Sequence, residues 1–390
     1  MTLKKSILCI SNPTWDGNYA KSIVEIAKVL SERHRILYVE NAATFKDLWD
    51  AARNKDFDLI GRILGLKPRL RKVKTPKSAV WVLSPGPNIP VNFLPKGRLY
   101  RTLLRFNNRI SYNQIKEALQ TIKMAKIDAC ITAFNPMMGV DLVSWIEARR
   151  HVYYCYDEIK SARYLSKHGT YLEEELFQLC DSCFVSSEGL LAKKSLITQK
   201  PIVLIKNAAN IALFNSVFVE QLPANPMVGF LGSIDERLDT ELVKYAVQNC
   251  PNLEFEFIGR VLNAEFKEAL INFDNVSFIP GDALEKVVHR LKRFSVGIIP
   301  FLKNEFTAGI YPLKINEYLA AGIPVIMTDF APLHEFKTMA TIVSDAEQFA
   351  RNLQIQIADD NVDKRRGRNA FAQQNSWDAR RDDIERVLFG

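Results

Sequence analysis

The residues best suited to chemistry lie in one segment of the second half of the chain, residues 309–326. Pro312 suits the first position of a helix and Gly322 the position just past its end, so we expect a helix of about ten residues between them. Lys314 would lie in the first turn, where a cation opposes the helix dipole and gains nothing unless an anion binds there. Glu317 would lie one turn further on the same face, where a carboxylate could accept both hydroxyls of a ribose. The alternative is a weak i, i+3 salt bridge between Lys314 and Glu317 on a surface helix.

Further candidate ligand contacts follow strands expected in the same half of the chain. Gly232 ends the apolar run 228–231 and would let backbone approach a diphosphate, and Arg237 in the next loop is placed to neutralise phosphate. The alternative for Arg237 is an exposed loop arginine. Gly259 and Asp282 each follow an apolar run, and strand ends of this kind face the ligand crevice in doubly wound sheets. Glycines at such positions are equally compatible with ordinary turns.

Two places in the first half are candidates for contact with substrate. Gly17 lies in the loop 13–18, which follows the first apolar run and opens a helix. This loop lacks the GxGxxG pattern of dinucleotide-binding proteins, so a nicotinamide or flavin role is disfavoured. Asp157 and Glu158 end the apolar run 152–156, and a carboxylate there could deprotonate an acceptor hydroxyl. Capping of the following helix by Asp157 is the competing interpretation.

Short apolar runs alternate with longer amphipathic stretches in both halves, which predicts two doubly wound α/β domains. A chain of 390 residues also exceeds the size at which one hydrophobic core stops growing. The strands expected in the first domain are 6–10, 35–40, 79–83, 128–133, 152–156 and 182–186, with helices over 18–33 and within 99–124. Those expected in the second are 227–231, 253–258, 276–279, 296–300, 324–327 and 340–343.

The predicted domain boundaries follow from breaks in these patterns. We expect a first domain over residues 1–205, a linker rich in Asn and Pro over 206–225, and a second domain over 226–375. Residues 376–390 predict a charged amphipathic helix, capped by Ser376, that returns to the first domain.

The positive charge of the chain is concentrated in one stretch, which we call the basic segment, Arg62 to Arg109. The whole chain carries a formal net charge of +8, whereas this segment has twelve Lys or Arg and no Asp or Glu. Leucines interleave with the cations, an arrangement expected of a segment that lies on an anionic membrane face. A solvated basic surface is the alternative. Few aromatic residues interleave with these charges, which disfavours a nucleic-acid partner.

The cysteines and the N-terminus predict a cytoplasmic location. The six cysteines lie mostly in apolar runs, which is typical of reduced thiols that act as small buried hydrophobes. The N-terminus runs directly into a short apolar strand, and no stretch approaches the roughly 20 apolar residues of a membrane span.

The segment around Glu317 resembles the GT-B glycosyltransferases, in particular the family 4-like group of bacterial polysaccharide and glycan assembly. That superfamily ends its nucleotide loop with a Pro, a helix bearing a Glu and a Gly-x-Pro-Val strand, which here match Pro312, Glu317 and residues 322–325. The resemblance implies two Rossmann-like domains that face a central cleft. The first would bind the acceptor, and the second would bind the nucleotide sugar with its ribose on Glu317.

The resemblance also implies a reaction. A hexosyl group would pass from a nucleoside diphosphate sugar, with UDP expected ahead of GDP, to a saccharide or lipid-linked glycan, without metal or other cofactor. Lys314, Arg237 and backbone amides would stabilise the leaving diphosphate. The amides expected to face the donor are those of Gly309, Ile310 and Tyr311. Retaining members usually carry a second Glu eight positions before the ribose Glu, and Gly309 stands there, so the stereochemical outcome stays open.

Other functions remain compatible with this sequence. A non-hydrolysing sugar-nucleotide epimerase would keep the fold and need no acceptor. A catalytically silent member of the superfamily would bind a partner and show no thermal shift with sugar nucleotides. A nucleic-acid-binding protein would use the basic segment and show steep salt dependence.

Overall fold

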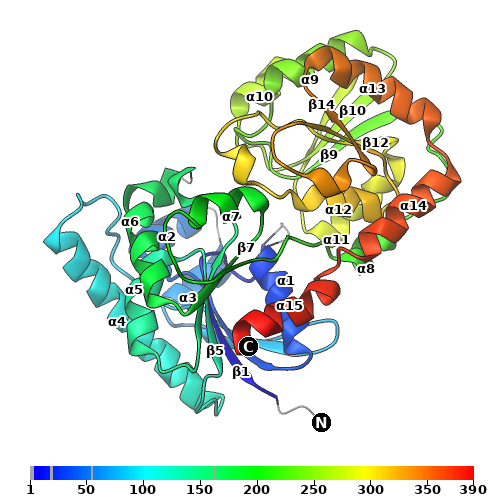
Figure 1. Ribbon diagram of the computed structural model, residues 1–390. Coiled ribbons are helices and arrows are strands. Elements are labelled where there is room, and N and C mark those ends of the chain that lie inside the picture. The colour runs from blue at the N-terminus through cyan, green and yellow to red at the C-terminus, as the bar shows by residue number, and fades with distance from the viewer. Residues whose placement is uncertain (1–3, 18–20, 54–55, 162) are drawn as a thin grey trace. The chain divides into compact units, whose positions relative to one another are not determined.

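The computed structural model describes residues 4–17, 21–53, 56–161 and 163–390, which form two compact units. The first unit contains the N-terminal strand up to Asp16, Lys21–Ile205 and Arg381–Gly390, and the second contains Lys206–Arg380 and also Gly17. Each unit has its own sheet with helices on both faces (Figure 1). The expected α/β class with two largely parallel sheets is therefore confirmed.

The first sheet has eight strands in the order β3-β4-β2-β1-β5-β6-β7-β8, parallel throughout except for the antiparallel pair β3 and β4. Its strands are β1 (Ser6–Ser11), β2 (Arg35–Val39), β3 (Leu70–Lys74), β4 (Ala79–Leu83), β5 (Ala129–Ala133), β6 (His151–Cys155), β7 (Ser182–Val185) and β8 (Ile202–Leu204). Side chains of the central strands are buried on both faces, as is usual for a parallel sheet covered by helices.

The helices of the first unit connect these strands. They are α1 (Ser22–Ser31), α2 (Phe45–Arg53), α3 (Phe57–Ile63), α4 (Arg98–Thr121), α5 (Pro136–Trp145), η1 (Ile159–Ser161), α6 (Arg163–Leu179), α7 (Glu188–Lys194) and the C-terminal α15 (Trp377–Phe389). Helix α15 lies beside α1 (Figure 1), where Arg381 pairs with Glu32 at 2.9 Å and Arg33 with Asp382 at 2.8 Å. The side-chain oxygen of Ser376 accepts the amide of Ala379, so the predicted cap is confirmed.

The second sheet has six parallel strands in the order β11-β10-β9-β12-β13-β14. They are β9 (Met227–Leu231), β10 (Glu254–Gly259), β11 (Val276–Pro280), β12 (Val296–Ile299), β13 (Val325–Thr328) and β14 (Ala340–Val343). The helices are α8 (Ile211–Asn215), α9 (Thr240–Asn249), α10 (Ala264–Leu270), α11 (Leu284–Val287), η2 (Val288–Arg293), η3 (Thr307–Gly309), α12 (Leu313–Ala320), η4 (His334–Phe336), α13 (Ala346–Asp359) and α14 (Val362–Gln373). Helix α9 packs on α13, and α12 packs on α14.

Three details differ from the sequence-based prediction, and a fourth, the start of the first helix, is not tested. Strand β3 was not predicted, because its Lys and Arg were assigned only to the basic segment; a charged strand is suited to the edge of a sheet, where it discourages pairing with other chains. The three-residue β8 was also missed. Helix α1 begins at Ser22, and the predicted start at Asn18 lies outside the described residues. The segment expected as a linker contains α8, whose first turn is capped by Asn210, and it packs Phe214 into the second core.

The position of α12 is determined by its contacts inside the second unit. The amide of Leu231, at the end of β9, donates to the Tyr318 hydroxyl at 2.8 Å. A Cβ on Gly297 of β12 would lie 2.6 Å from the Tyr318 ring, so the absent side chain lets the helix approach the sheet. The helix starts one residue later than predicted, with Pro312 as its N-cap and Leu313 as its first residue.

A buried ion cluster holds the other end of α12, and we call it the Asp360 cluster. Asp360 accepts from Arg365 Nε at 2.7 Å and from Arg368, and all three side chains are at least nine-tenths buried. Arg368 Nε donates to the carbonyl of Gly322 at 2.9 Å. The cluster therefore ties the end of α12 to α14.

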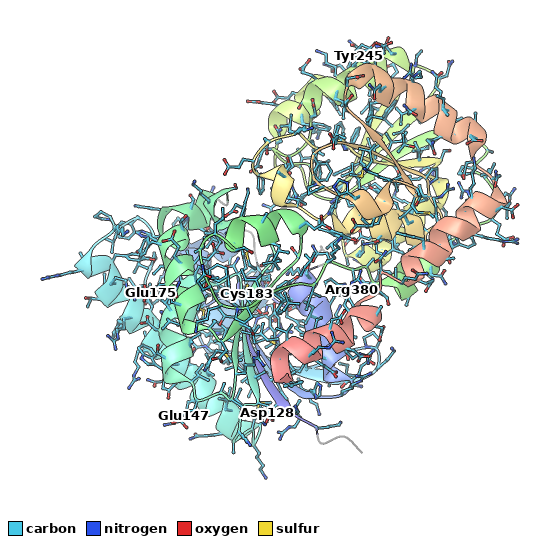
Figure 2. All side chains as sticks on the ribbon, viewed as in Figure 1. Asp128, Glu147, Glu175, Cys183, Tyr245 and Arg380 are labelled. Carbon is cyan, nitrogen blue, oxygen red and sulfur yellow. The ribbon has the colours of Figure 1, made fainter. Side chains whose placement is uncertain are left out.

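All six cysteines are buried as free thiols, as expected from their apolar surroundings, and Cys183 lies inside the first unit (Figure 2). Among the described residues, no helix has both the length and the apolar character that crossing a bilayer requires.

Candidate active site

Three of the predicted site residues meet where β9 and β10 end. A Cβ added to Gly232 would lie 2.4 Å from the Lys314 ammonium, so the lysine lies directly against the Gly232 backbone. A Cβ added to Gly259 would lie 1.9 Å from the carbonyl oxygen of Gly232. Both glycines have positive φ, 148° and 153°, a conformation that other residues rarely adopt. The structure thus brings Gly232, Gly259 and Lys314 together at the carboxyl edge of the second sheet.

The charge on Lys314 is poorly stabilised by its surroundings. Burial and repulsion by Arg237 lower its pKa to about 8, although the carboxylates of Glu317 and Asp235 act in the opposite direction. Its Nζ lies 5.3 Å from the centre of the Phe230 ring. Lys314 is in the first turn of α12, and the N-cap Pro312 has no side-chain acceptor for the amides of that turn. A cation beside open helix amides favours a bound anion.

Arg237 is held in place by a carboxylate that the sequence reading did not single out. Its Nε donates to Asp235 Oδ1 at 2.8 Å and its Nη2 to Asp235 Oδ2, a two-point contact that fixes the guanidinium plane. The guanidinium also lies over the Phe301 ring, 5.3 Å from its centre. Arg237 therefore differs from a mobile loop arginine, the alternative that the sequence left open.

Glu317 lies on the same helix as Lys314 and is 6% exposed. Its charge raises the pKa of Lys314, so the two groups interact as the i, i+3 spacing predicts. A nearly buried carboxylate on this helix differs from the surface pair that was the alternative. Contact of the Glu317 carboxylate with the hydroxyls of a ribose stays a prediction.

The loop before α12 is less open than expected. The amides of Gly309 and Ile310 donate to the backbone carbonyls of Phe306 and Thr307, within the turn η3. Tyr311 is 3% exposed, and burial raises the pKa of its hydroxyl. The amides of Gly309 and Ile310 are thus bonded within the turn, and contact of the amides of residues 309–311 with a donor stays a prediction.

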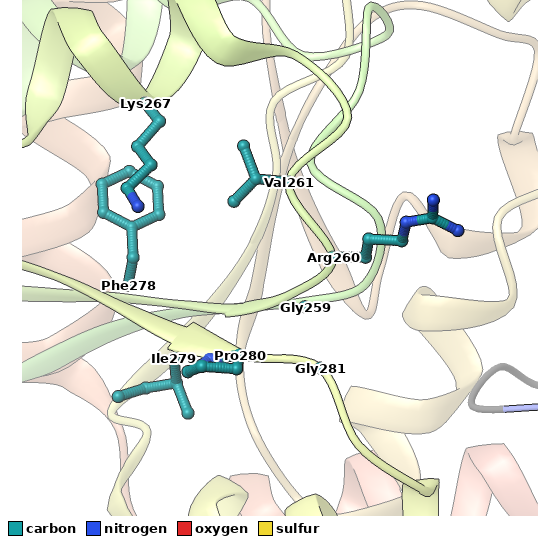
Figure 3. Close-up of a pocket in the computed structure, with 8 residues that line it drawn as sticks. All are labelled: Gly259, Arg260, Val261, Lys267, Phe278, Ile279, Pro280 and Gly281. Carbon is teal, nitrogen blue, oxygen red and sulfur yellow. The ribbon is translucent and has the colours of Figure 1, made fainter. Parts of the chain in front are cut away.

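A cavity of about 350 Å³ lies beside Gly259, between the ends of β10 and β11 (Figure 3). Lys267 lies over the Phe278 ring, 5.8 Å from its centre, whereas Arg260 extends away from that ring (Figure 3). Asp282 is not among the lining residues. It bonds locally, to the amide of Ala283 and to Lys286, and these bonds lower its pKa.

The two carboxylates predicted in the first unit have different environments. Glu158 is 8% exposed and pairs with Lys194 at 2.9 Å, and Lys194 also pairs with Glu173 at 2.8 Å. Burial raises the pKa of Glu173. Because the Glu158 carboxylate is already engaged by Lys194, Asp157 is the better candidate of the two predicted carboxylates. Asp157 is half-buried and accepts the amide of Glu158 at 2.8 Å.

The loop that contains Gly17 is organised by a second residue that the sequence reading missed. Glu40, 5% exposed at the end of β2, accepts the amide of Trp15 at 2.7 Å and lies 3.3 Å from Arg71. Gly17 is exposed, and the residues 18–20 that follow lie outside the described part of the chain. Glu40 stands at the end of an apolar run in the sequence, and this position could have marked it as a candidate residue.

The contact between Gly259 and Gly232 gives a first prediction. We expect Gly259→Ala to lower the free energy of unfolding by at least about 2 kcal/mol, because strain at positive φ adds to the clash with the Gly232 carbonyl. Gly367→Ala is the matched control, since its Cβ would meet nothing within 4 Å and it lies inside α14. That variant should be neutral or more stable by up to about 1 kcal/mol in urea unfolding. Equal stability of the two variants would contradict the close contact.

Comparison with known proteins shows that part of the chain matches a protein family. Residues 225–359 match the family model described as glycosyl transferases group 1. No curated protein sequence matches the chain. Among solved structures, a sucrose-phosphate synthase from Thermosynechococcus elongatus is 16% identical with a TM-score of 0.69, and each chain covers 98% of the other.

Two further solved structures have the same fold. HepE from Anabaena, in complex with UDP and glucose, is 14% identical with a TM-score of 0.66, and 99% of each chain is covered. An α,α-trehalose-phosphate synthase from Burkholderia xenovorans, in complex with glucose-6-phosphate, is 10% identical with a TM-score of 0.68, covering 99% of this chain and 100% of that one. Residues 225–359 thus match the glycosyl transferases group 1 family, and the whole chain shares the two-domain GT-B fold of these solved structures.

Proposed function

We propose that this glycosyltransferase takes its sugar from a UDP-sugar and that Lys314 and Arg237 neutralise the leaving diphosphate without a metal ion. The observation that carries the proposal is the position of Lys314, an ammonium pressed against Gly232 with a pKa lowered to about 8. A cation kept in so unfavourable a setting is explained by an anion that binds beside it. The UDP bound by the Anabaena HepE protein, which has the same fold, supports the choice of nucleotide.

The remaining donor contacts follow from the same edge of the sheet. In this proposal Glu317 accepts the ribose hydroxyls, and the cavity beside Gly259 receives the base. The diphosphate lies between Gly232 and the first turn of α12, where preorganised amides and two cations face the charge that develops as the sugar leaves. Asp157 is the proposed base toward the acceptor hydroxyl if the reaction inverts.

Nucleotide binding tests the donor site directly. We expect UDP to raise the melting temperature of the full chain in metal-free buffer with EDTA, more than GDP, ADP, CMP or dTDP at equal concentration. Magnesium should add little to the UDP shift, because Lys314 and Arg237 supply the positive charge. A shift that requires magnesium would contradict the metal-free donor site, and a larger shift with another nucleotide would contradict the choice of UDP.

The acceptor side of the proposal places the protein at the cytoplasmic face of a membrane, with a saccharide or lipid-linked glycan as acceptor. Within the basic segment, Leu66 is 79% exposed and Leu99 is 62% exposed. Some of its cations are paired with carboxylates of the same unit: Arg71 pairs with Asp16, and Arg101 pairs with Glu175. Exposed Lys72 and Lys74 on the edge strand, together with the apolar side chains, support contact with an anionic bilayer.

Vesicle flotation tests this contact. We expect the chain to float with vesicles containing phosphatidylserine and to remain unbound with phosphatidylcholine alone, and binding should fall as salt is raised. The double variant Leu66→Ser, Leu99→Ser should bind about tenfold more weakly, because two apolar side chains no longer enter the interface. Leu196→Ser is the control, since Leu196 is 89% exposed and lies outside the segment. Equal loss in the control would contradict the role of the basic segment.

A further inference from the structure

A second cavity, of about 420 Å³, lies within the first unit where several parallel strands end. Asn12 follows β1, Asn41 follows β2 and Asn135 follows β5, and all three line it. Strands β1 and β5 are neighbours in the sheet, and the strand order reverses between them. In open α/β sheets this switch point at the carboxyl edge is where ligands bind. The volume also falls in the range of about 300–1,000 Å³ that is usual for small-molecule sites.

The lining of this cavity is amide-rich and almost uncharged. Among the described residues, nineteen line the cavity; seven of them are asparagines, and the ionisable side chains among them are those of Lys46 and Asp47. Asp47 is occupied locally, because it accepts from both the amide and the hydroxyl of Thr44. Lys46 is exposed. The remaining lining is largely apolar and includes Met137 and Leu104.

Some of these asparagines are fixed by the fold. Asn107 receives the amide of Ile89 at 2.9 Å and donates to the carbonyl of the same residue at 2.8 Å, which holds the loop above α4. Asn135 caps α5 and donates to Asn41 Oδ1 at 3.1 Å. These bonds make the cavity wall rigid before any ligand enters.

Two other asparagines have unused hydrogen-bonding capacity. Asn88 is 7% exposed and Asn108 is 1% exposed, and within the described part of the chain neither side-chain carbonyl oxygen has a hydrogen-bond partner. A buried carbonyl without a donor is destabilising, and a ligand hydroxyl would relieve that cost. Both residues line the cavity.

We propose that this cavity binds an uncharged sugar ring of the acceptor; the inference rests on the proposed transferase function. Asparagine amides both donate and accept, as sugar hydroxyls do, and the apolar side chains suit the C–H face of a pyranose. A phosphorylated or acidic sugar would instead call for arginine or several lysines, which bind such anions in paired hydrogen bonds. The cavity therefore selects a neutral sugar over an anionic one.

Saturation-transfer NMR on the full chain with UDP present tests this selection. The probes are the methyl glycosides of glucose, galactose and mannose, compared with glucose 6-phosphate and methyl glucuronide. We expect at least one neutral glycoside to bind at least tenfold more tightly than either anionic sugar. UDP binding is measured by calorimetry on the same samples, so that failure of the donor site is detected separately.

Three variants connect binding to the cavity. Asn88→Ala removes one unpaired side-chain oxygen but keeps the loop, since the backbone amide of residue 88 still donates to the carbonyl of Ala43 at 2.8 Å. This variant should weaken glycoside binding about fivefold. Ile89→Trp, at a lining position that is 38% exposed, should block the cavity. Asn113→Ala, on an exposed position of α4 outside the cavity, should leave binding unchanged.

Each outcome of this experiment decides the proposal. It is overturned if UDP binds while no neutral glycoside does, if an anionic sugar binds as tightly, or if Asn88→Ala and Ile89→Trp bind like Asn113→Ala. Glycoside binding that follows the expected variant pattern in a chain that fails to bind UDP would support the cavity and contradict the proposed donor site.

Discussion

Replacing Lys314 by Met is expected to weaken UDP binding about 10- to 100-fold, the loss that follows from removing a charge-assisted hydrogen bond. The same variant should unfold at higher urea concentration below pH 8. The pKa of Lys314 is lowered to about 8 in the folded chain, so its charged form opposes folding and its removal relieves that cost. Calorimetry and urea unfolding measure the two effects. Loss of binding together with gain in stability distinguishes a functional lysine from a structural one.

The control for Lys314→Met is Lys292→Met. Lys292 is exposed in η2, which precedes β12 and so lies toward the opposite edge of the sheet. Lys292→Met should change neither the affinity for UDP nor the free energy of unfolding by a measurable amount. If both variants bind UDP like the unmodified chain, Lys314 is not part of the donor site.

The pH dependence of UDP binding follows from the same group. Below pH 8 Lys314 carries its charge and attracts the diphosphate, whereas above pH 8 it must take up a proton before it can do so. We therefore expect the dissociation constant of UDP to rise about tenfold between pH 7 and pH 9. Lys314→Met should remove most of this dependence.

Replacing Asp360 by Asn is expected to lower the free energy of unfolding by about 3–5 kcal/mol, the largest stability effect in the second unit. The substitution keeps the shape of the side chain but leaves the guanidinium groups of Arg365 and Arg368 buried without a counter-charge. Because Arg368 also holds the carbonyl of Gly322, the end of α12 should loosen as well. Urea unfolding followed by circular dichroism measures the change.

The neighbouring residue supplies a matched control. Asp359 pairs with Lys364, but both side chains are largely exposed, at 64% and 45%. Surface pairs of this kind contribute about 0–1 kcal/mol, so Asp359→Asn should have little effect. A loss for Asp360→Asn no greater than that for Asp359→Asn would mean that the buried cluster does not support the fold.

Local patterns in the sequence predicted most of the fold but little of the side-chain pairing. The strands 79–83, 227–231 and 340–343 were predicted with the bounds that the structure has, because apolar runs between breakers report burial directly. Strand β3 was missed since its charged residues carry no such signal. The pairing of Glu158 with Lys194 depends on the distance between β6 and α7 in three dimensions, which spacing along the chain does not reveal.

The candidate donor site was likewise predicted in part. The helix at Lys314 followed from Pro312 and Gly322, which mark helix ends by their backbone preferences. That Lys314 lies against Gly232, and that Asp235 orients Arg237, required the packing of α12 on β9. The asparagine cavity of the first unit had no sequence signal at all, because its lining is spread from Asn12 to Leu165.

The C-terminal helix gives the chain a particular order of assembly during synthesis. Arg381–Gly390 belongs to the first unit, where Ile384 and Leu388 are fully buried, although the second unit is translated in between. At about 5–20 residues per second, ribosomes would need roughly 10 to 35 s to make that intervening stretch. During this time the surface of α1 that α15 later covers stays open, so the first domain can complete its core only after the second domain has been synthesised.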